Sequence, residues 1–233
     1  MIPVLFDHAL FLVLLVVLPL LGLQDIRQLH AEVAGGRPDA RIRSYRRGLV
    51  QEWLPTLALV VAWNALERPA AALGFGHPVR WEHWTVLGLG VAGAALGALQ
   101  MRWLLSRPEG RAKLREGFGP LAAFLPHSVA EGRWFTALGL SAGICEELLY
   151  RGFLVAYLAS FLGLWPGALA AGAVFGIAHL YQGWGGIVRT GIFGVVFALL
   201  YAWSGQLWGL VILHAAVDVL NGRAARVVQK SGQ

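Results

Sequence analysis

Ionisable side chains stand at three places in this chain where the neighbouring residues are apolar. In chain order they are Glu146, Glu147, Arg151, His179, His214 and Asp218. An ionisable group at the centre of a bilayer costs about 2.5–3.5 kcal/mol on insertion scales, so it must face a protein interior or water and usually has a partner. These residues are therefore the candidates for a functional site.

The spacing within CEELLYRG, residues 145–152, separates the roles of two adjacent acids. Glu147 and Arg151 are four residues apart with the acid first, which is the favoured arrangement for an ion pair on one helix face. Glu146 lies about 100° around the helix and does not share that face. We expect Arg151 to neutralise Glu147 and to leave Glu146 free.

Two later segments repeat the four-residue spacing. Phe175 and His179 form one such pair, and His214 and Asp218 form the other. Asn221, three residues past Asp218, extends the same polar face. A single histidine in a membrane helix is often only a satisfied core group, whereas histidines and carboxylates spread over three helices favour a functional site.

This set of side chains suits the hydrolysis of a peptide bond. A carboxylate beside a histidine can take a proton from water, and a second polar pair can stabilise the oxyanion of a tetrahedral intermediate. The same side chains could instead hold zinc with an open water position, and their spacing does not separate the two chemistries. A thiol mechanism at Cys145 is not favoured, because a cysteine among apolar residues is normally an inert small hydrophobe.

The composition predicts an all-α membrane protein. Hydrophobic residues make up 57% of the 233 positions and charged residues only 14%, with a mean hydropathy of +0.61. About seven apolar segments approach the length of about 20 residues that spans a bilayer as a helix. They run over residues 9–23, 49–66, 85–104, 134–158, 165–180, 188–203 and 207–220. A re-entrant piece over residues 121–130 would change this number.

The basic residues predict orientation rather than a nucleic-acid partner. They cluster after the first apolar segment and between the third and the fourth, as expected of cytoplasmic loops. They are Arg27, Arg37, Arg41, Arg43, Arg46 and Arg47 in the first cluster, and Arg102, Arg107, Arg111, Lys113, Arg115 and Arg133 in the second. We expect a multi-pass protein of the cytoplasmic membrane with its N-terminus outside and its C-terminus in the cytoplasm.

One membrane domain over residues 1–233 is the simplest organisation, because no internal repeat and no linker is evident. Small residues recur at a spacing of four, as in Gly93 with Gly97 and Gly172 with Gly176. This spacing allows helices to approach closely. We therefore interpret these glycines as packing positions in a tight bundle.

The ordered motifs Glu146-Glu147-x-x-x-Arg151, Phe175-x-x-x-His179 and His214-x-x-x-Asp218 resemble the CPBP family of intramembrane proteases. This family is also called the CAAX-processing protease or abortive-infection family. The resemblance covers about residues 140–222, whereas residues 1–130 contain less specific membrane helices and cytoplasmic loops. It implies a helical, glutamate-dependent hydrolase without a metal, whose active site opens toward the cytoplasm.

The resemblance also implies individual roles. Glu146 and His179 would activate water, His214 and Asp218 would form the oxyanion hole, and Glu147 with Arg151 would brace the site. The family often has asparagine at the position of Asp218, and an ionised carboxylate would repel an oxyanion. Asp218 is then protonated, its role passes to His214 and Asn221, or the protein hydrolyses peptides poorly.

The depths of Glu146 and His179 in the membrane lead to a prediction about the helix that carries Glu146. Counted from Trp134 at about 1.5 Å per residue, Glu146 lies near mid-membrane, whereas His179 lies near the end of its own helix. We expect the helix that carries Glu146 to be long or tilted and to begin after Trp134, which would bring them level.

The leading hypothesis is an intramembrane endopeptidase that acts on peptide or protein segments near the membrane surface. The alternatives are a metal-dependent membrane peptidase, a non-catalytic scaffold or immunity protein that binds a partner peptide, and a proton or ion transporter. Transport lacks the support of inverted repeats or paired broken helices. The resemblance supplies a reaction type, but neither the substrate, nor its prenylation, nor the oligomeric state follows from it.

Overall fold

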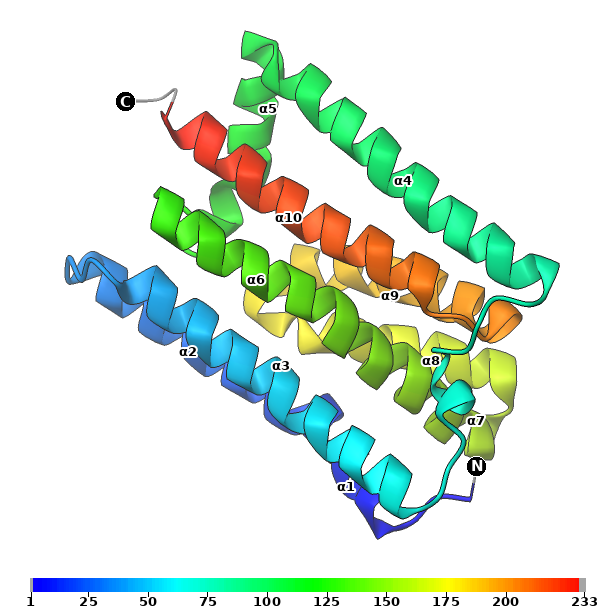
Figure 1. Ribbon diagram of the computed structural model, residues 1–233. Coiled ribbons are helices and arrows are strands. Elements are labelled where there is room, and N and C mark those ends of the chain that lie inside the picture. Colours follow the sequence, from blue (N-terminus) through cyan, green and yellow to red (C-terminus); the bar gives the residue numbers. More distant parts are fainter. Residues whose placement is uncertain (1, 231–233) are drawn as a thin grey trace.

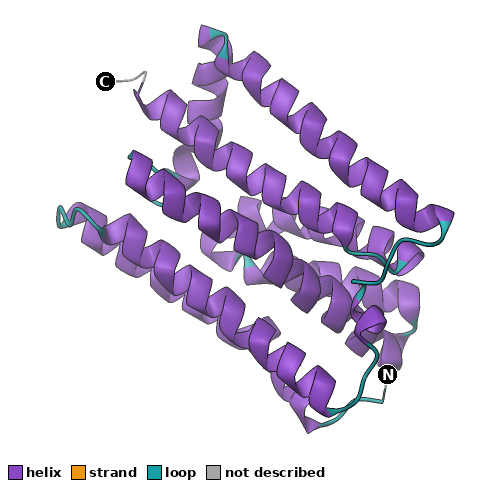
Figure 2. Ribbon diagram, in the orientation of Figure 1, coloured by secondary structure: helices purple, strands orange, loops and turns teal. Residues whose placement is uncertain are grey.

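The computed structural model describes residues 2–230, and every regular element in that range is a helix (Figure 2). The elements are α1 (Leu5–Leu12), η1 (Val13–Val17), α2 (Leu18–Ala34), α3 (Ala40–Ala65), η2 (Ala70–Leu73), α4 (Trp81–Leu105), α5 (Pro108–Phe118), η3 (Gly119–Leu121), α6 (Val129–Glu146), η4 (Glu147–Val155), α7 (Ala156–Leu162), α8 (Leu164–Ala178), η5 (Leu180–Gln182), α9 (Gly183–Ser204) and α10 (Trp208–Lys230). Of these, η1 and η4 are π-helical, and η2, η3 and η5 are 3₁₀ turns. The prediction of an all-α protein is confirmed.

The apolar segments expected from the sequence correspond to the long helices. Within residues 2–230, three helices are long and apolar enough to cross a membrane by length and composition, namely Leu5–Ala34, Trp81–Leu105 and Leu180–Ser204, and Leu164–Ala178 is a shorter apolar helix. The other long helices, α3, α6 and α10, carry a higher proportion of charged residues. Residues 119–128 form a 3₁₀ turn and a loop rather than a spanning helix.

The helices lie in a bundle with α6 near its centre (Figure 1). Helix α6 contacts α3 on one side and α10 on the other, and α10 in turn contacts α4. Helices α8 and α9 form a hairpin that packs against η4. Helices α8 and α9 therefore pack against the charged stretch that begins at Glu146, and α10 packs against the helix that leads into it.

Glycines bring the helices close together, as their spacing predicts. A Cβ added to Gly172 would lie 2.5 Å from the Cα of Val195, and one added to Gly176 would lie 2.8 Å from a Cα of α9. Gly93 is similarly tight, at 3.0 Å from a side chain of α10, whereas Gly97 makes an ordinary contact. Larger residues in α8 would push α9 away from the site.

The helix that carries Glu146 differs from its predicted form in two ways. It begins at Val129 and not after Trp134, because Ser128 accepts a hydrogen bond from the backbone N–H of Glu131 while the Glu131 carboxylate accepts one from the backbone N–H of Ser128. It also continues as a π-helix through Glu147–Val155, every residue of which is buried. A π-turn inserts one extra residue and occurs frequently at functional sites.

Candidate active site

The turn at Gly163 brings Glu146 and His179 to the same level. Glu146 lies 17 residues before the glycine (163 − 146) and His179 lies 16 after it (179 − 163). Gly163 has a φ of 86°, a left-handed conformation that favours glycine and reverses the chain between α7 and α8. Tyr150 and Phe175 are also nearly equidistant from the turn, and their ring centroids are 5.1 Å apart. Hairpin register, rather than a late start of the helix, therefore aligns the two residues.

Two glycines of α6 allow the polar face of α10 to approach closely. A Cβ added to Gly143 would lie 2.7 Å from the Cβ of Ala215, and one added to Gly139 would lie 2.8 Å from the Cβ of Asp218. This close approach places His214 beside the two glutamates.

Glu147 contacts both His214 and Arg151. His214 Nδ1 donates a hydrogen bond to Glu147 Oε1 at 2.7 Å, and Arg151 forms an ion pair with the same oxygen at 2.9 Å. The side chains of Glu147 and Arg151 are 0% and 1% exposed. The guanidinium of Arg151 also lies 4.2 Å from the ring centroid of Phe175. The ion pair predicted from the spacing is thus present and fully desolvated.

The second nitrogen of His214 faces the other carboxylates. Nε2 lies 3.7 Å from Glu146 Oε2 and 3.8 Å from Asp218 Oδ2. These distances are too long for direct hydrogen bonds but short enough for electrostatic attraction. Because Nδ1 is held by Glu147, the imidazole ring has a defined orientation with Nε2 toward Glu146 and Asp218.

His179 is oriented by its own helix. Its Nδ1 lies 2.9 Å from the carbonyl oxygen of Phe175, and its ring centroid lies 4.6 Å from that of Phe175. A carbonyl can only accept, so Nδ1 carries the proton and Nε2 of the neutral ring has a free lone pair. The contact between residues 175 and 179 that the spacing predicts is formed, with the rings tilted, and it leaves His179 able to accept a proton.

One cavity of about 530 Å³ gathers most of the predicted residues. Its walls include Glu146, Phe175, His179, His214, Asp218 and Asn221. Glu147 and Arg151 lie beneath these walls rather than in them. The structure therefore divides the predicted residues into a cavity-facing group and a buried supporting pair.

Sequence reasoning missed Glu52, which comes from α3 and lines the same cavity. Its Oε2 atom is buried and has no hydrogen-bond partner among the residues that the structure describes. The signal was present, because Glu52 is an ionisable residue inside the apolar segment predicted over residues 49–66. Glu52 was overlooked because it lies near the Arg-rich end of that segment, where the sequence also fits a loop.

Metal binding and a thiol mechanism are the two other chemistries that the sequence suggests for this region. Within residues 2–230, no group of three or more His, Cys, Asp or Glu side chains is arranged to hold a metal ion. Cys145 is 0% exposed and does not line the large cavity, in agreement with the inert role expected for it.

Comparison with protein-family models matches residues 130–220 to the Rce1-like family, described as type II CAAX prenyl endopeptidase Rce1-like. This match confirms the resemblance of the motifs to the CAAX-processing proteases and ends one residue before Asn221. Comparisons with curated proteins and with solved structures give no match. The family match and the apolar helices indicate a membrane protein, and the match supports the role of a membrane endopeptidase.

Proposed function

We propose that this protein is a glutamate-dependent endopeptidase of the cytoplasmic membrane, with its N-terminus outside and its C-terminus in the cytoplasm. It hydrolyses a peptide bond in a segment that enters the large cavity from the membrane surface. The observation that carries this proposal is the meeting of Glu146 and His179 on a cavity wall that also includes His214 and Asp218.

Glu146 and His179 activate the water. Glu146 comes from α6 and His179 from the end of α8, and the free lone pair of His179 Nε2 gives the site a neutral base beside a carboxylate. One of them takes a proton as the water oxygen bonds to the peptide carbonyl carbon. The proton then passes to the leaving nitrogen as the C–N bond breaks, which yields a carboxylic acid and an amine.

His214 stabilises the oxyanion of the tetrahedral intermediate. Donation from Nε2 requires the imidazolium form, because Nδ1 already gives its proton to Glu147. The carboxylates of Glu146 and Asp218, at 3.7 and 3.8 Å, balance that positive charge. Of the three alternatives for Asp218, we favour the one in which its role as a donor passes to His214 and Asn221.

Glu147 and Arg151 act as positioning residues. Glu147 holds the ring of His214, and Arg151 neutralises the carboxylate that does so. The arginine is itself sandwiched near the rings of Phe175 and Phe197, at 4.2 and 5.3 Å. This support limits the rotation of the His214 ring away from the cavity.

The test is mass-spectrometric detection of cleavage in a mixed pool of prenylated and unmodified peptides by the purified protein in detergent. Wild type is compared with Glu146→Gln, and with Glu109→Gln as a matched control on the exposed start of α5. Each protein is assayed with and without a metal chelator. We expect cleavage by wild type and Glu109→Gln only, unchanged by the chelator.

Other outcomes select the alternatives. Loss of cleavage with the chelator and recovery with zinc would replace the proposed mechanism by a metal-dependent one. No cleavage from a demonstrably folded protein would overturn the proposal in favour of a peptide-binding role. Cleavage that is equal in wild type and Glu146→Gln would remove Glu146 from the mechanism.

A further inference from the structure

Glu146 and His179 also line a second, smaller cavity of about 140 Å³. It extends toward α2 and α3, on the side away from α10. The two cavities share the residues Glu52, Phe124, Leu138, Glu146, His179 and Tyr181. These six shared residues, called the partition below, lie where the two cavities adjoin, and they include both proposed water-activating residues.

The partition contains carboxylate oxygens that need a hydrogen-bond donor. Oε2 of Glu52 and Oε2 of Glu146 are both buried, and neither has a partner within residues 2–230. A carboxyl oxygen that carries no proton accepts hydrogen bonds, and a buried polar group without a partner commonly binds water. One water needs about 10–15 Å³ of cavity, so the smaller cavity is large enough for several.

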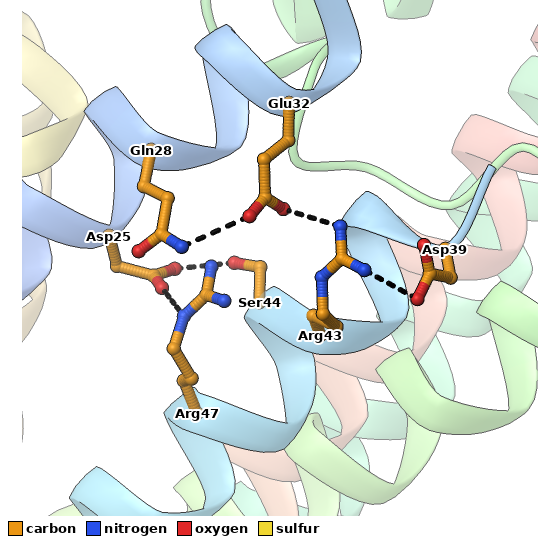
Figure 3. Close-up of polar contacts among 7 residues, drawn as sticks. All are labelled: Asp25, Gln28, Glu32, Asp39, Arg43, Ser44 and Arg47. Atoms are coloured by element: carbon orange, nitrogen blue, oxygen red, sulfur yellow. Dashed lines mark hydrogen bonds and ion pairs between the residues drawn. The ribbon is translucent and has the colours of Figure 1, made fainter. Parts of the chain in front are cut away.

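Polar side chains lead from the small cavity toward the end of the α2–α3 pair (Figure 3). Asp25 and Ser44 line the cavity, and the carboxylate of Asp25 accepts hydrogen bonds from Ser44 and Arg47. Farther along, Arg43 bridges Glu32 and Asp39 at 3.1 and 2.6 Å. These polar contacts between α2 and α3 extend from the small cavity on the side that does not line the large cavity.

We propose that the small cavity is a water chamber that supplies the hydrolytic water from the α2–α3 side while the peptide occupies the large cavity. Glu52 positions this water against Glu146 by accepting one of its hydrogen bonds, and it exchanges no proton. The inference rests on the proposed function for the identity of the reaction. It solves a physical problem, because a peptide that fills the large cavity would displace the water that must attack it.

Accessibility of engineered cysteines tests the chamber without any need for catalysis. In a Cys145→Ala background, Gln51→Cys places a thiol in the small cavity and Val217→Cys places one in the large cavity. The probe is Ag⁺, which is close to water in size, and its reaction is measured as thiols protected from later alkylation. We expect both engineered thiols to react. In the wild-type protein, measured separately, we expect the fully buried Cys145 to remain unreactive.

A variant that narrows the small cavity adds a second test. A Cβ added to Gly48 would lie 3.0 Å from the side chain of Leu138 in the partition, so Gly48→Val narrows the small cavity. We expect Gly48→Val to slow the reaction of Gln51→Cys by roughly tenfold and to leave Val217→Cys unchanged. A Gln51→Cys thiol that stays unreactive while Val217→Cys reacts would overturn the chamber.

Kinetics on any peptide cleaved from the pool tests the role of Glu52. Removal of a water-positioning group should lower kcat by roughly tenfold to 100-fold in Glu52→Gln and leave KM within about twofold. Glu52→Asp should recover part of the loss because it keeps the carboxyl group. The controls are Glu109→Gln and Gly88→Val, since an added Cβ at Gly88 meets open space.

The two hypotheses fail separately. A folded protein without cleavage but with a reactive Gln51→Cys thiol would overturn the proposed function and leave the chamber intact. An active protein whose kcat is unchanged in both Glu52→Gln and Gly48→Val would overturn the water chamber and leave the peptidase intact.

Discussion

Two regions of this protein pair carboxylates with arginines, and they differ in their contact with solvent. In the core, the Glu147 and Arg151 side chains are 0% and 1% exposed. At the end of α2 and α3, Arg43 is 31% exposed and its partner Asp39 is 54% exposed. The same ion-pair chemistry therefore serves two purposes, because a desolvated pair is costly to break and an exposed pair is worth little.

The two regions also differ in their position relative to the proposed reaction. The core pair supports His214, which faces the large cavity, whereas the α2–α3 network reaches the small cavity through Asp25 and Ser44. We therefore expect changes in the core to affect catalysis and folding strongly, and changes at the end of the helix pair to affect both weakly. Four substitutions test this contrast.

Glu146→Gln should have the largest effect. It keeps the shape of the side chain but removes the carboxylate that takes a proton from water, and general acid–base groups contribute about 10²- to 10⁴-fold to rate. We expect a loss of kcat near the upper end of that range with an unchanged unfolding temperature. A variant that retains more than one tenth of the wild-type kcat would contradict the assignment.

Glu147→Ala should damage the fold. It leaves Arg151 as an unpaired charge inside the bundle and removes the acceptor of His214, and breaking a buried ion pair costs about 3–5 kcal/mol. Thermal unfolding in detergent measures the loss, with Glu109→Ala as the exposed control. A double variant, Glu147→Gln with Arg151→Met, should be less unstable than Glu147→Ala because it leaves no unpaired charge. Equal stability of the two variants would argue against this account.

His214→Gln should lower kcat by about 10²- to 10³-fold, the effect of removing one donor from an oxyanion hole. The matched comparison is Asp218→Asn on the same helix face. We expect that variant to stay within about tenfold of wild type, because an amide replaces a charge-balancing carboxylate by a possible donor. If Asp218→Asn were as defective as His214→Gln, the carboxylate itself would be required.

Arg43→Ala should have the smallest effect. It breaks two ion pairs of the partly exposed network, and exposed pairs contribute about 0–1 kcal/mol each. We expect a small decrease in the unfolding temperature that vanishes at high salt, with kcat unchanged. A loss comparable to that of Glu147→Ala would show that the network holds α2 and α3 together.

Local spacing was enough to predict several features of the core. The pairing of Glu147 with Arg151 and the ring contact of His179 with Phe175 both follow from residues four apart on one helix. Hydropathy gave the approximate positions of the long helices, since a bilayer requires continuous apolar segments of a set length. The start at Val129 was predicted wrongly, although Ser128 and Glu131 form a capping box that marks it.

The sequence by itself determined which side chains are out of place in an apolar chain, because hydropathy and helical period are properties of short segments. Only the tertiary structure decided how those side chains meet. The hydrogen bond between Glu147 and His214 joins residues 67 positions apart, and the π-helix at Glu147–Val155 and the place of Glu52 in the partition also depend on neighbouring helices. Rotation and depth of one helix against another arise from packing of whole faces, which no local spacing encodes.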